Sequence, residues 1–303
     1  MAQISAALVK ELREKTGAGM MDAKKALVES EGDMEAAVDW LRAKGLSKAA
    51  KKSGRTAADG LVAAILSDDG KTGAVVEFNA ETDFVARNEQ FQSGLRAIVK
   101  TALETDGSAE TVLAAPAPEG EGTVADMVTR MVATIGENMT LRRSEKLSVD
   151  QGAVAAYIHN AEADGMGKVA VLVALEGEGG DLSEIGRKVA MHVAATSPAS
   201  ATVDELDPEL VERERTVLSE EARASGKPET VIEKMIEGRM KKFYKEVVLV
   251  EQPFVMDPDK TVGDVLKESG ASLKGFVHYK LGEGIEKEGD DFASEVAAMS
   301  KGG

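Results

Sequence analysis

The sequence predicts an α+β protein made of several small modules. Three observations lead to this prediction: amphipathic helical patterns fill the first 41 residues, apolar strand patterns begin after Gly60 and recur later, and a charged helical pair follows residue 206. A chain of 303 residues, 43% of them hydrophobic, can bury more than one core. We therefore expect separate modules along the chain.

Residues 1–54 are predicted to form a small module of three helices. The first pattern begins at Ser5, a candidate N-cap, and Gly32-Asp33 separates the second from the third. The next stretch, 44–55, carries five basic side chains, which are Lys44, Lys48, Lys51, Lys52 and Arg55. We interpret this basic stretch as a solvated connecting segment, and a nucleic-acid contact is the alternative.

A repeated pattern predicts a core of duplicated α+β subdomains with antiparallel sheets, at 55–140 and 141–281. Each copy has two apolar strands followed by an amphipathic helix. The strands are expected at 60–65 and 73–78 in the first copy and at 152–157 and 167–172 in the second. Another amphipathic helix is expected from Val124 to Ile135.

Residues 206–247 are predicted to be an antiparallel helical hairpin. Asp207 and Pro208 supply an N-cap and a first-turn proline, and apolar residues follow at helical spacing among dense charges. Further on, Thr261 is expected to cap a short helix. Phe292, Val296 and Met299 predict another short helix at the end of the chain.

Composition and charge restrict the function classes. The formal net charge of −16 opposes a phosphate backbone, so a protein partner is favoured over direct nucleic-acid binding. The chain has no cysteine, which excludes disulfides and thiolate metal sites and gives no support to an oxidising compartment. Because no signal-peptide pattern or long apolar run is present, we expect a cytoplasmic protein that does not span a membrane.

No motif predicts an enzyme. The three histidines, His159, His192 and His278, lack the spacing of metal ligands, and His192 lies on the apolar face of its helix as a core residue would. The glycine-containing stretch 164–168 lacks the spacing of a phosphate loop and is expected to be a turn. We therefore expect no catalytic residue, no metal and no cofactor.

One segment places a charged residue beside a large aromatic directly after an apolar strand. It runs Thr82-Asp83-Phe84-Val85. From the pattern alone, Thr82 or Asp83 caps a helix and Phe84 packs against the core.

A series of motifs in fixed order identifies a family resemblance. The motifs are Thr16-Gly17-Ala18-Gly19-Met20-Met21-Asp22, Glu81-Thr82-Asp83-Phe84-Val85-Ala86, Ile135-Gly136-Glu137-Asn138, Met191-His192-Val193-Ala194-Ala195, Glu237-Gly238-Arg239-Met240-Lys241-Lys242-Phe243, Gln252-Pro253-Phe254-Val255-Met256 and Gly282-Glu283-Gly284-Ile285-Glu286-Lys287. Over essentially the whole chain they resemble the bacterial elongation factor Ts family, the exchange factors of elongation factor Tu.

The resemblance implies a first module similar to ubiquitin-associated domains, a two-subdomain core with a coiled-coil hairpin inserted at 206–247, and a C-terminal helical module at 282–303. It also implies guanine nucleotide exchange on Tu without catalytic chemistry of the chain's own. Thr82, Asp83, Phe84 and Val85 would enter the GTPase domain of Tu near its magnesium site and promote GDP release. The other contacts that it implies are Leu12, Met20 and Met21 in the first module and His159 at a second interface. A nucleic-acid-binding or ribosome-associated protein using 44–55 is the alternative, and self-association through the hairpin stays open.

Overall fold

The chain divides into two compact units and has the predicted α+β fold class. A computed structural model describes residues 4–16, 18–118, 120–178, 181–224 and 226–286. Unit 1 comprises Met1–Val62, Val76–Ser144 and Lys280–Gly303, and unit 2 comprises Ala63–Val75 and Glu145–Tyr279. The boundaries predicted at 54, 140 and 281 stay predictions.

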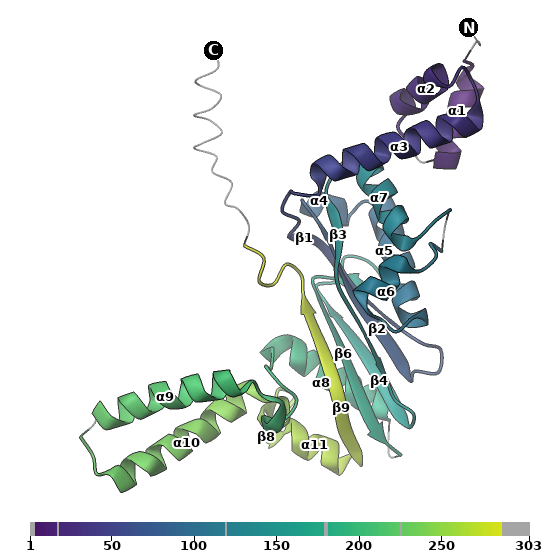
Figure 1. Cartoon of the computed structure of the whole chain (residues 1–303). Coiled ribbons are helices and arrows are strands. Elements are labelled where there is room, and N and C mark those ends of the chain that lie inside the picture. The colour runs from purple at the N-terminus through teal and green to yellow at the C-terminus, as the bar shows by residue number, and fades with distance from the viewer. Residues whose placement is uncertain (1–3, 17, 119, 179–180, 225, 287–303) are drawn as a thin grey trace, which may run out of the picture. The chain divides into compact units, whose positions relative to one another are not determined.

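Unit 1 begins with three helices, α1 (Ala6–Thr16), α2 (Met20–Glu29) and α3 (Met34–Lys52), as Figure 1 shows in purple and dark blue. Asp33 caps α3 by accepting a hydrogen bond from the Ala36 amide. The three helices share a small buried core, whose members are Val9, Leu12, Ala23, Ala26, Leu27 and Ala37. This core confirms the predicted three-helix module.

The interpretation of 44–55 as a connecting segment was wrong, because α3 continues to Lys52. Its later turns pack on α7 (Val124–Ile135), where a Cβ atom at Gly45 would lie 3.3 Å from the Ala133 Cβ atom. Two of its lysines also bind acceptors within the chain. Lys44 contacts the Asp22 carboxylate at 2.6 Å, and Lys52 donates to the Gly136 carbonyl. Packing on α7 thus extends the helix beyond its predicted end.

The four-stranded sheet has the order β3-β2-β1-β5. Its strands are β1 (Asp59–Leu66), β2 (Thr72–Ala80), β3 (Met139–Ser148) and β5 (Met166–Gly167), and the other helices of unit 1 are α4 (Asp83–Ala86), α5 (Glu89–Glu104) and α6 (Ala109–Ala114). Phe78 of β2 stacks on Phe91 of α5, with ring centroids 5.0 Å apart. This stacking fixes the end of β2, just before residue 81, against α5.

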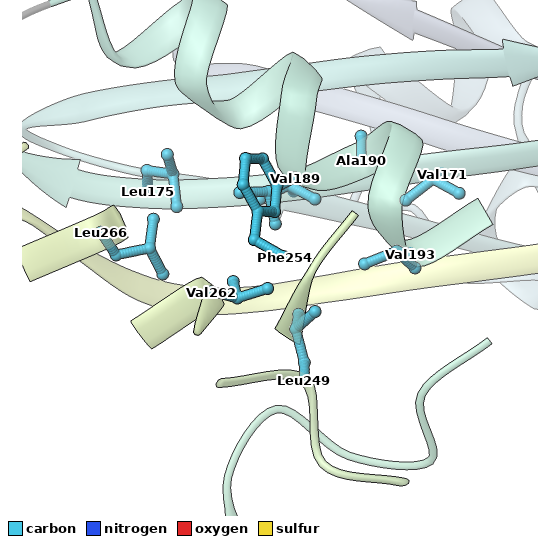
Figure 2. Packing of buried hydrophobic residues seen from close by; sticks show 10 residues of the cluster. Val171, Leu175, Val189, Ala190, Val193, Leu249, Phe254, Val262 and Leu266 are labelled. Carbon is cyan, nitrogen blue, oxygen red and sulfur yellow. The ribbon is translucent and has the colours of Figure 1, made fainter. Parts of the chain in front are cut away.

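Unit 2 contains the three-stranded sheet β4-β6-β9, formed by β4 (Gly152–His159), β6 (Val169–Gly177) and β9 (Ala271–Lys280). Strands β4 and β6 pair antiparallel, and α8 (Leu182–Thr196) packs on them. Figure 2 shows apolar side chains of β6 and α8 meeting Leu249, Phe254, Val262 and Leu266 in one core. The turn expected at 164–168 lies at Asp164 and Gly165.

The predicted hairpin consists of α9 (Pro208–Ala224) and α10 (Glu229–Val247), which lie side by side in Figure 1. Leu218 and Ala222 of α9 and Ile232 and Met240 of α10 are buried. Smaller elements complete unit 2: η1 (Val203–Glu205), η2 (Leu249–Glu251), β7 (Pro253–Phe254), β8 (Asp257–Thr261) and α11 (Val262–Glu268). Thr261 caps α11 in a capping box, as predicted.

The C-terminal helical module was predicted at 282–303, and its part from 287 onward lies outside the described residues. Among the helices in the described part of the chain, none combines the length and the apolar composition that a bilayer crossing requires.

Candidate partner-binding site

Phe84 is the most exposed large apolar side chain in the described residues, with 80% of its surface accessible. It lies on α4, a helix of only four residues, in which Val85 and Ala86 are buried. We call residues 82–86 the knuckle. The interpretation that Phe84 packs against the core was therefore wrong, because its two successors take the inward positions and leave Phe84 pointing into solvent.

The hydroxyl of Thr82 does not cap the knuckle helix, since it is used elsewhere. It donates to a Glu137 carboxylate oxygen at 2.7 Å, and the Thr82 amide donates to the other oxygen at 3.0 Å. The cap for α5 comes from Asn88, whose side chain accepts hydrogen bonds from the amides of Gln90 and Phe91. Contacts on both sides thus fix the backbone of the knuckle.

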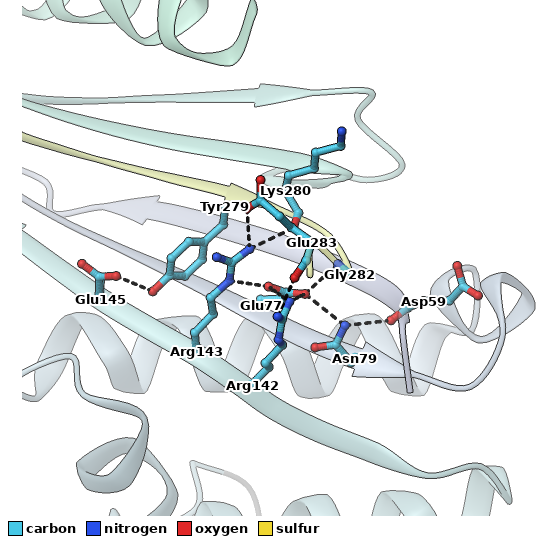
Figure 3. Close-up of polar contacts among 10 residues, drawn as sticks. All are labelled: Asp59, Glu77, Asn79, Arg142, Arg143, Glu145, Tyr279, Lys280, Gly282 and Glu283. Atoms are coloured by element: carbon cyan, nitrogen blue, oxygen red, sulfur yellow. Dashed lines mark hydrogen bonds and ion pairs between the residues drawn. The ribbon is translucent and has the colours of Figure 1, made fainter. Parts of the chain in front are cut away.

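Strand β2, which leads into the knuckle, is anchored by a buried carboxylate. Figure 3 shows Glu77 receiving hydrogen bonds from Arg142 at 3.1 Å, from Arg143, and from the Gly282 amide at 2.8 Å. Burial raises the pKa of Glu77, but the hydrogen bonds from Gly282, Arg143 and Asn79 outweigh it and hold that pKa below its ordinary value. Glu77 is therefore a buried, ionised carboxylate whose hydrogen bonds compensate for its loss of solvent.

The arginines around Glu77 also bind the segment after β9. Arg143 donates to the Lys280 carbonyl at 2.9 Å, and Arg142 donates to the Glu283 carbonyl at 2.5 Å. The same cluster thus fixes β2, β3 and residues 280–283 of unit 1.

The first module presents a second pair of apolar side chains. Met20 and Met21, at the start of α2, are 61% and 76% exposed. Leu12, in contrast, is completely buried in the helical core with Val9 and Leu27. The contact role that the resemblance implies for Leu12 stays a prediction, and in the chain by itself this side chain has no accessible surface.

In unit 2, His159 is exposed at the end of β4, with its Nδ1 atom 3.2 Å from the Tyr157 hydroxyl. Sequence reasoning did not assign the exposed pair Val255 and Met256, which follows the buried Phe254. Both residues lie in the turn between β7 and β8, so strand alternation in the sequence gave no signal for the pair. We add this pair to the candidate contact residues.

The Val255–Met256 pair is held by His192, which is buried in the core as predicted. The His192 Nδ1 atom accepts from the Val255 amide at 3.2 Å, and Nε2 lies 2.8 Å from the Gln252 Oε1 atom. Burial lowers the pKa of His192, only partly opposed by the hydrogen bond to Gln252, so the neutral imidazole is favoured. This histidine positions a surface turn.

Two further features of the described surface concern ligand binding, namely its potential metal ligands and a hollow beside α11. Within residues 4–286, apart from those not described, no three potential metal ligands lie together. A shallow hollow of about 270 Å³ beside α11 is lined by Lys260 and Glu268, which bind each other at 2.6 Å. These two charges thus neutralise each other.

Large apolar side chains on short, anchored segments are typical of a protein that docks on another protein. The fold and the exposed side chains therefore define a protein of the docking class.

The family model described as "Elongation factor TS" matches residues 81–283. Elongation factor Ts of Hyphomonas neptunium is 72% identical over 302 residues, and those of Rhizobium rhizogenes and Caulobacter vibrioides are 58% and 57% identical over 310 residues, with 99–100% of each chain covered. The chain belongs to the elongation factor Ts family and functions in translation elongation.

Proposed function

We propose that this chain is a guanine nucleotide exchange factor for elongation factor Tu, acting in the cytoplasm without catalytic chemistry of its own. The observation that carries the proposal is the 80% exposure of Phe84 on an otherwise anchored knuckle. An exposed aromatic ring contributes little to the stability of the fold, whereas its burial in a partner supplies binding free energy.

In this proposal Asp83 and Phe84 enter the GTPase domain of Tu near its magnesium site. The ring occupies apolar space between elements of the partner, while the Asp83 carboxylate adds negative charge close to the metal and the phosphates. Thr82 and Val85 hold the two side chains from either side. Weaker coordination of the metal lowers the affinity for GDP, and GTP then binds the vacated site.

The thermodynamic basis is linkage. A factor that binds nucleotide-free Tu more tightly than GDP-bound Tu lowers the affinity of Tu for GDP by the same factor. Each tenfold change requires about 1.4 kcal/mol of differential contact. Met20 and Met21 would supply contact area that does not depend on the nucleotide, and His159 and the Val255–Met256 pair are candidates for a further interface.

A nucleic-acid-binding function through 44–55 has less support. Lys44, Lys52 and Arg55 already contact acceptors within the chain, which are the Asp22 carboxylate, the Gly136 carbonyl and the Glu81 carboxylate. A phosphate backbone would have to replace these contacts against the net negative charge. A salt-dependent gel shift with RNA tests this alternative directly.

The decisive experiment measures release of a fluorescent GDP analogue from Tu with and without the chain. We expect the chain to accelerate release in a concentration-dependent and saturable manner. Release at the intrinsic rate, with a folded chain present in excess, would refute the proposed function.

A further inference from the structure

Two carboxylates bind two neighbouring segments of unit 1 to each other in both directions. Glu137, after α7, accepts from the amide and the hydroxyl of Thr82 at 3.0 and 2.7 Å. Glu81, before the knuckle, accepts from the Asn138 amide at 2.5 Å. Each segment thus supplies an acceptor for the backbone of the other, and we call these contacts the reciprocal clamp.

The end of α3 is bound to the same place. Asn138 donates its side-chain amide to the Arg55 carbonyl at 2.7 Å, and the Arg55 guanidinium lies 3.4 Å from Glu81. Lys52 donates to the carbonyl of Gly136, the left-handed residue that ends α7. Three chain segments therefore meet immediately beside the knuckle.

The C-terminal end of the knuckle is held separately, by the Gln92 side chain, which donates to the Ala86 carbonyl at 2.9 Å. A helix of four residues is too short to be stable by itself, and with 80% of its surface accessible Phe84 has little packing that could orient it. Val85 and Ala86 fix the inward side. The direction in which Phe84 points therefore depends on how firmly the backbone at Thr82 is held.

We propose that Glu137 is a positioning residue that pre-organises the knuckle for its partner. This inference rests on the proposed function and specifies how its contact residue is prepared. Without the Glu137 carboxylate, the Thr82 amide and hydroxyl lose their common acceptor and Phe84 samples several directions. The partner then binds only the fraction of molecules with the productive direction, and binding is weaker by that fraction.

The test compares Glu137→Ala with Glu137→Gln, which keeps one side-chain oxygen as an acceptor. Glu104→Ala is the matched control, since it removes an exposed carboxylate at the far end of α5. Hydrogen exchange at the Thr82 amide, measured by nuclear magnetic resonance on the full chain alone, reports the clamp without any partner. We expect fast exchange at Thr82 in Glu137→Ala, intermediate exchange in Glu137→Gln, and parental exchange in the control.

The second readout is the concentration of chain needed for half-maximal GDP release from Tu. For Glu137→Ala we expect this concentration to rise about tenfold with the maximal rate retained, and for Glu137→Gln a smaller rise, as expected for a loss of pre-organisation. A merely structural role would instead lower the melting temperature in parallel with activity. Should Glu137→Ala fail to fold, Thr82→Val removes only the hydroxyl donor and is measured in the same way.

Two outcomes separate this inference from the proposed function. If Thr82 loses protection while half-maximal release occurs at the parental concentration, positioning by Glu137 is refuted and exchange on Tu stands. If the parental chain does not accelerate release, the proposed function is refuted. Unchanged protection at Thr82 in Glu137→Ala would refute the clamp itself, whatever the outcome with Tu.

Discussion

Replacing Phe84 by alanine removes the side chain on which the proposed exchange mechanism depends. The ring is 80% exposed, so its removal takes almost no packing from the folded chain. We expect the free energy of unfolding to change by no more than about 0.5 kcal/mol, as for other surface substitutions. Phe91→Ala is the contrasting variant, because Phe91 is completely buried and should cost about 3 to 5 kcal/mol of stability.

The effect on exchange follows from the area that Phe84 can bury in Tu. Complete burial of a phenylalanine side chain contributes about 1.5 to 3 kcal/mol, and four-fifths of that surface is available, which gives about 1 to 2.5 kcal/mol. At about 1.4 kcal/mol per factor of ten, Phe84→Ala should slow GDP release at subsaturating concentration roughly 5- to 60-fold.

Stopped-flow release of the fluorescent GDP analogue, together with thermal unfolding of the same preparation, measures both quantities. Asp83→Ala, in the same assay, tests whether the adjacent carboxylate contributes. A Phe84→Ala variant with parental stability and parental exchange would refute the wedge role of the knuckle. A variant with lowered stability would refute our account of Phe84 as a side chain without a folding role.

Three further predictions concern other parts of the chain. A truncation that starts at Ser53 should bind Tu more weakly while the remaining units fold, and equal affinity in calorimetry would contradict a docking role for the first module. Replacing 206–247 by a short Gly-Ser linker should preserve a native-like melting transition and near-parental GDP release, with self-association or part of the affinity lost, because the buried residues of α9 and α10 face each other. Because the pKa of Glu77 is lower in the folded chain than its ordinary value of 4.5, its contribution to stability is present above pH 4.5 and is lost as the pH falls through the folded pKa. Denaturant unfolding should show this loss in the parent and not in Glu77→Gln, a variant that should also cost about 3 kcal/mol at neutral pH.

Local patterns predicted the elements whose apolar residues follow one regular period. Helix α7 and the three-helix core are of this kind, because their spacing alone determines which face is buried. Strand β6 was predicted instead from a continuous apolar run, and most of its residues are buried. In the hairpin the helical periodicity was correct, and Val217 and Val231 are exposed while their neighbours Leu218 and Ile232 take the inward positions. One residue rotates a helix face by about 100°.

Strand β3 was missed for a physical reason. Its centre carries Arg142 and Arg143, which resemble a solvated surface until their buried acceptor, Glu77 on another strand, is known. The outward direction of Phe84 could not be predicted from the sequence pattern either, because the local pattern does not distinguish an aromatic that packs inward from one presented to a partner. The family resemblance supplied the expectation of a partner contact at Phe84, and that contact stays a prediction.

The hydrogen bond between Glu77 and the Gly282 amide joins residues 205 positions apart. Synthesis on the ribosome proceeds from the N-terminus, so β2 emerges long before its last donor does. Closing so long a loop adds little to the equilibrium cost, which grows only with the logarithm of its length, but contacts so distant in sequence form slowly. A nascent chain arrested before residue 280 carries a buried carboxylate without its backbone donor, and its arginines lack the carbonyls of Lys280 and Glu283. Residues 280–283, made late in synthesis, thus decide whether unit 1 reaches its full stability.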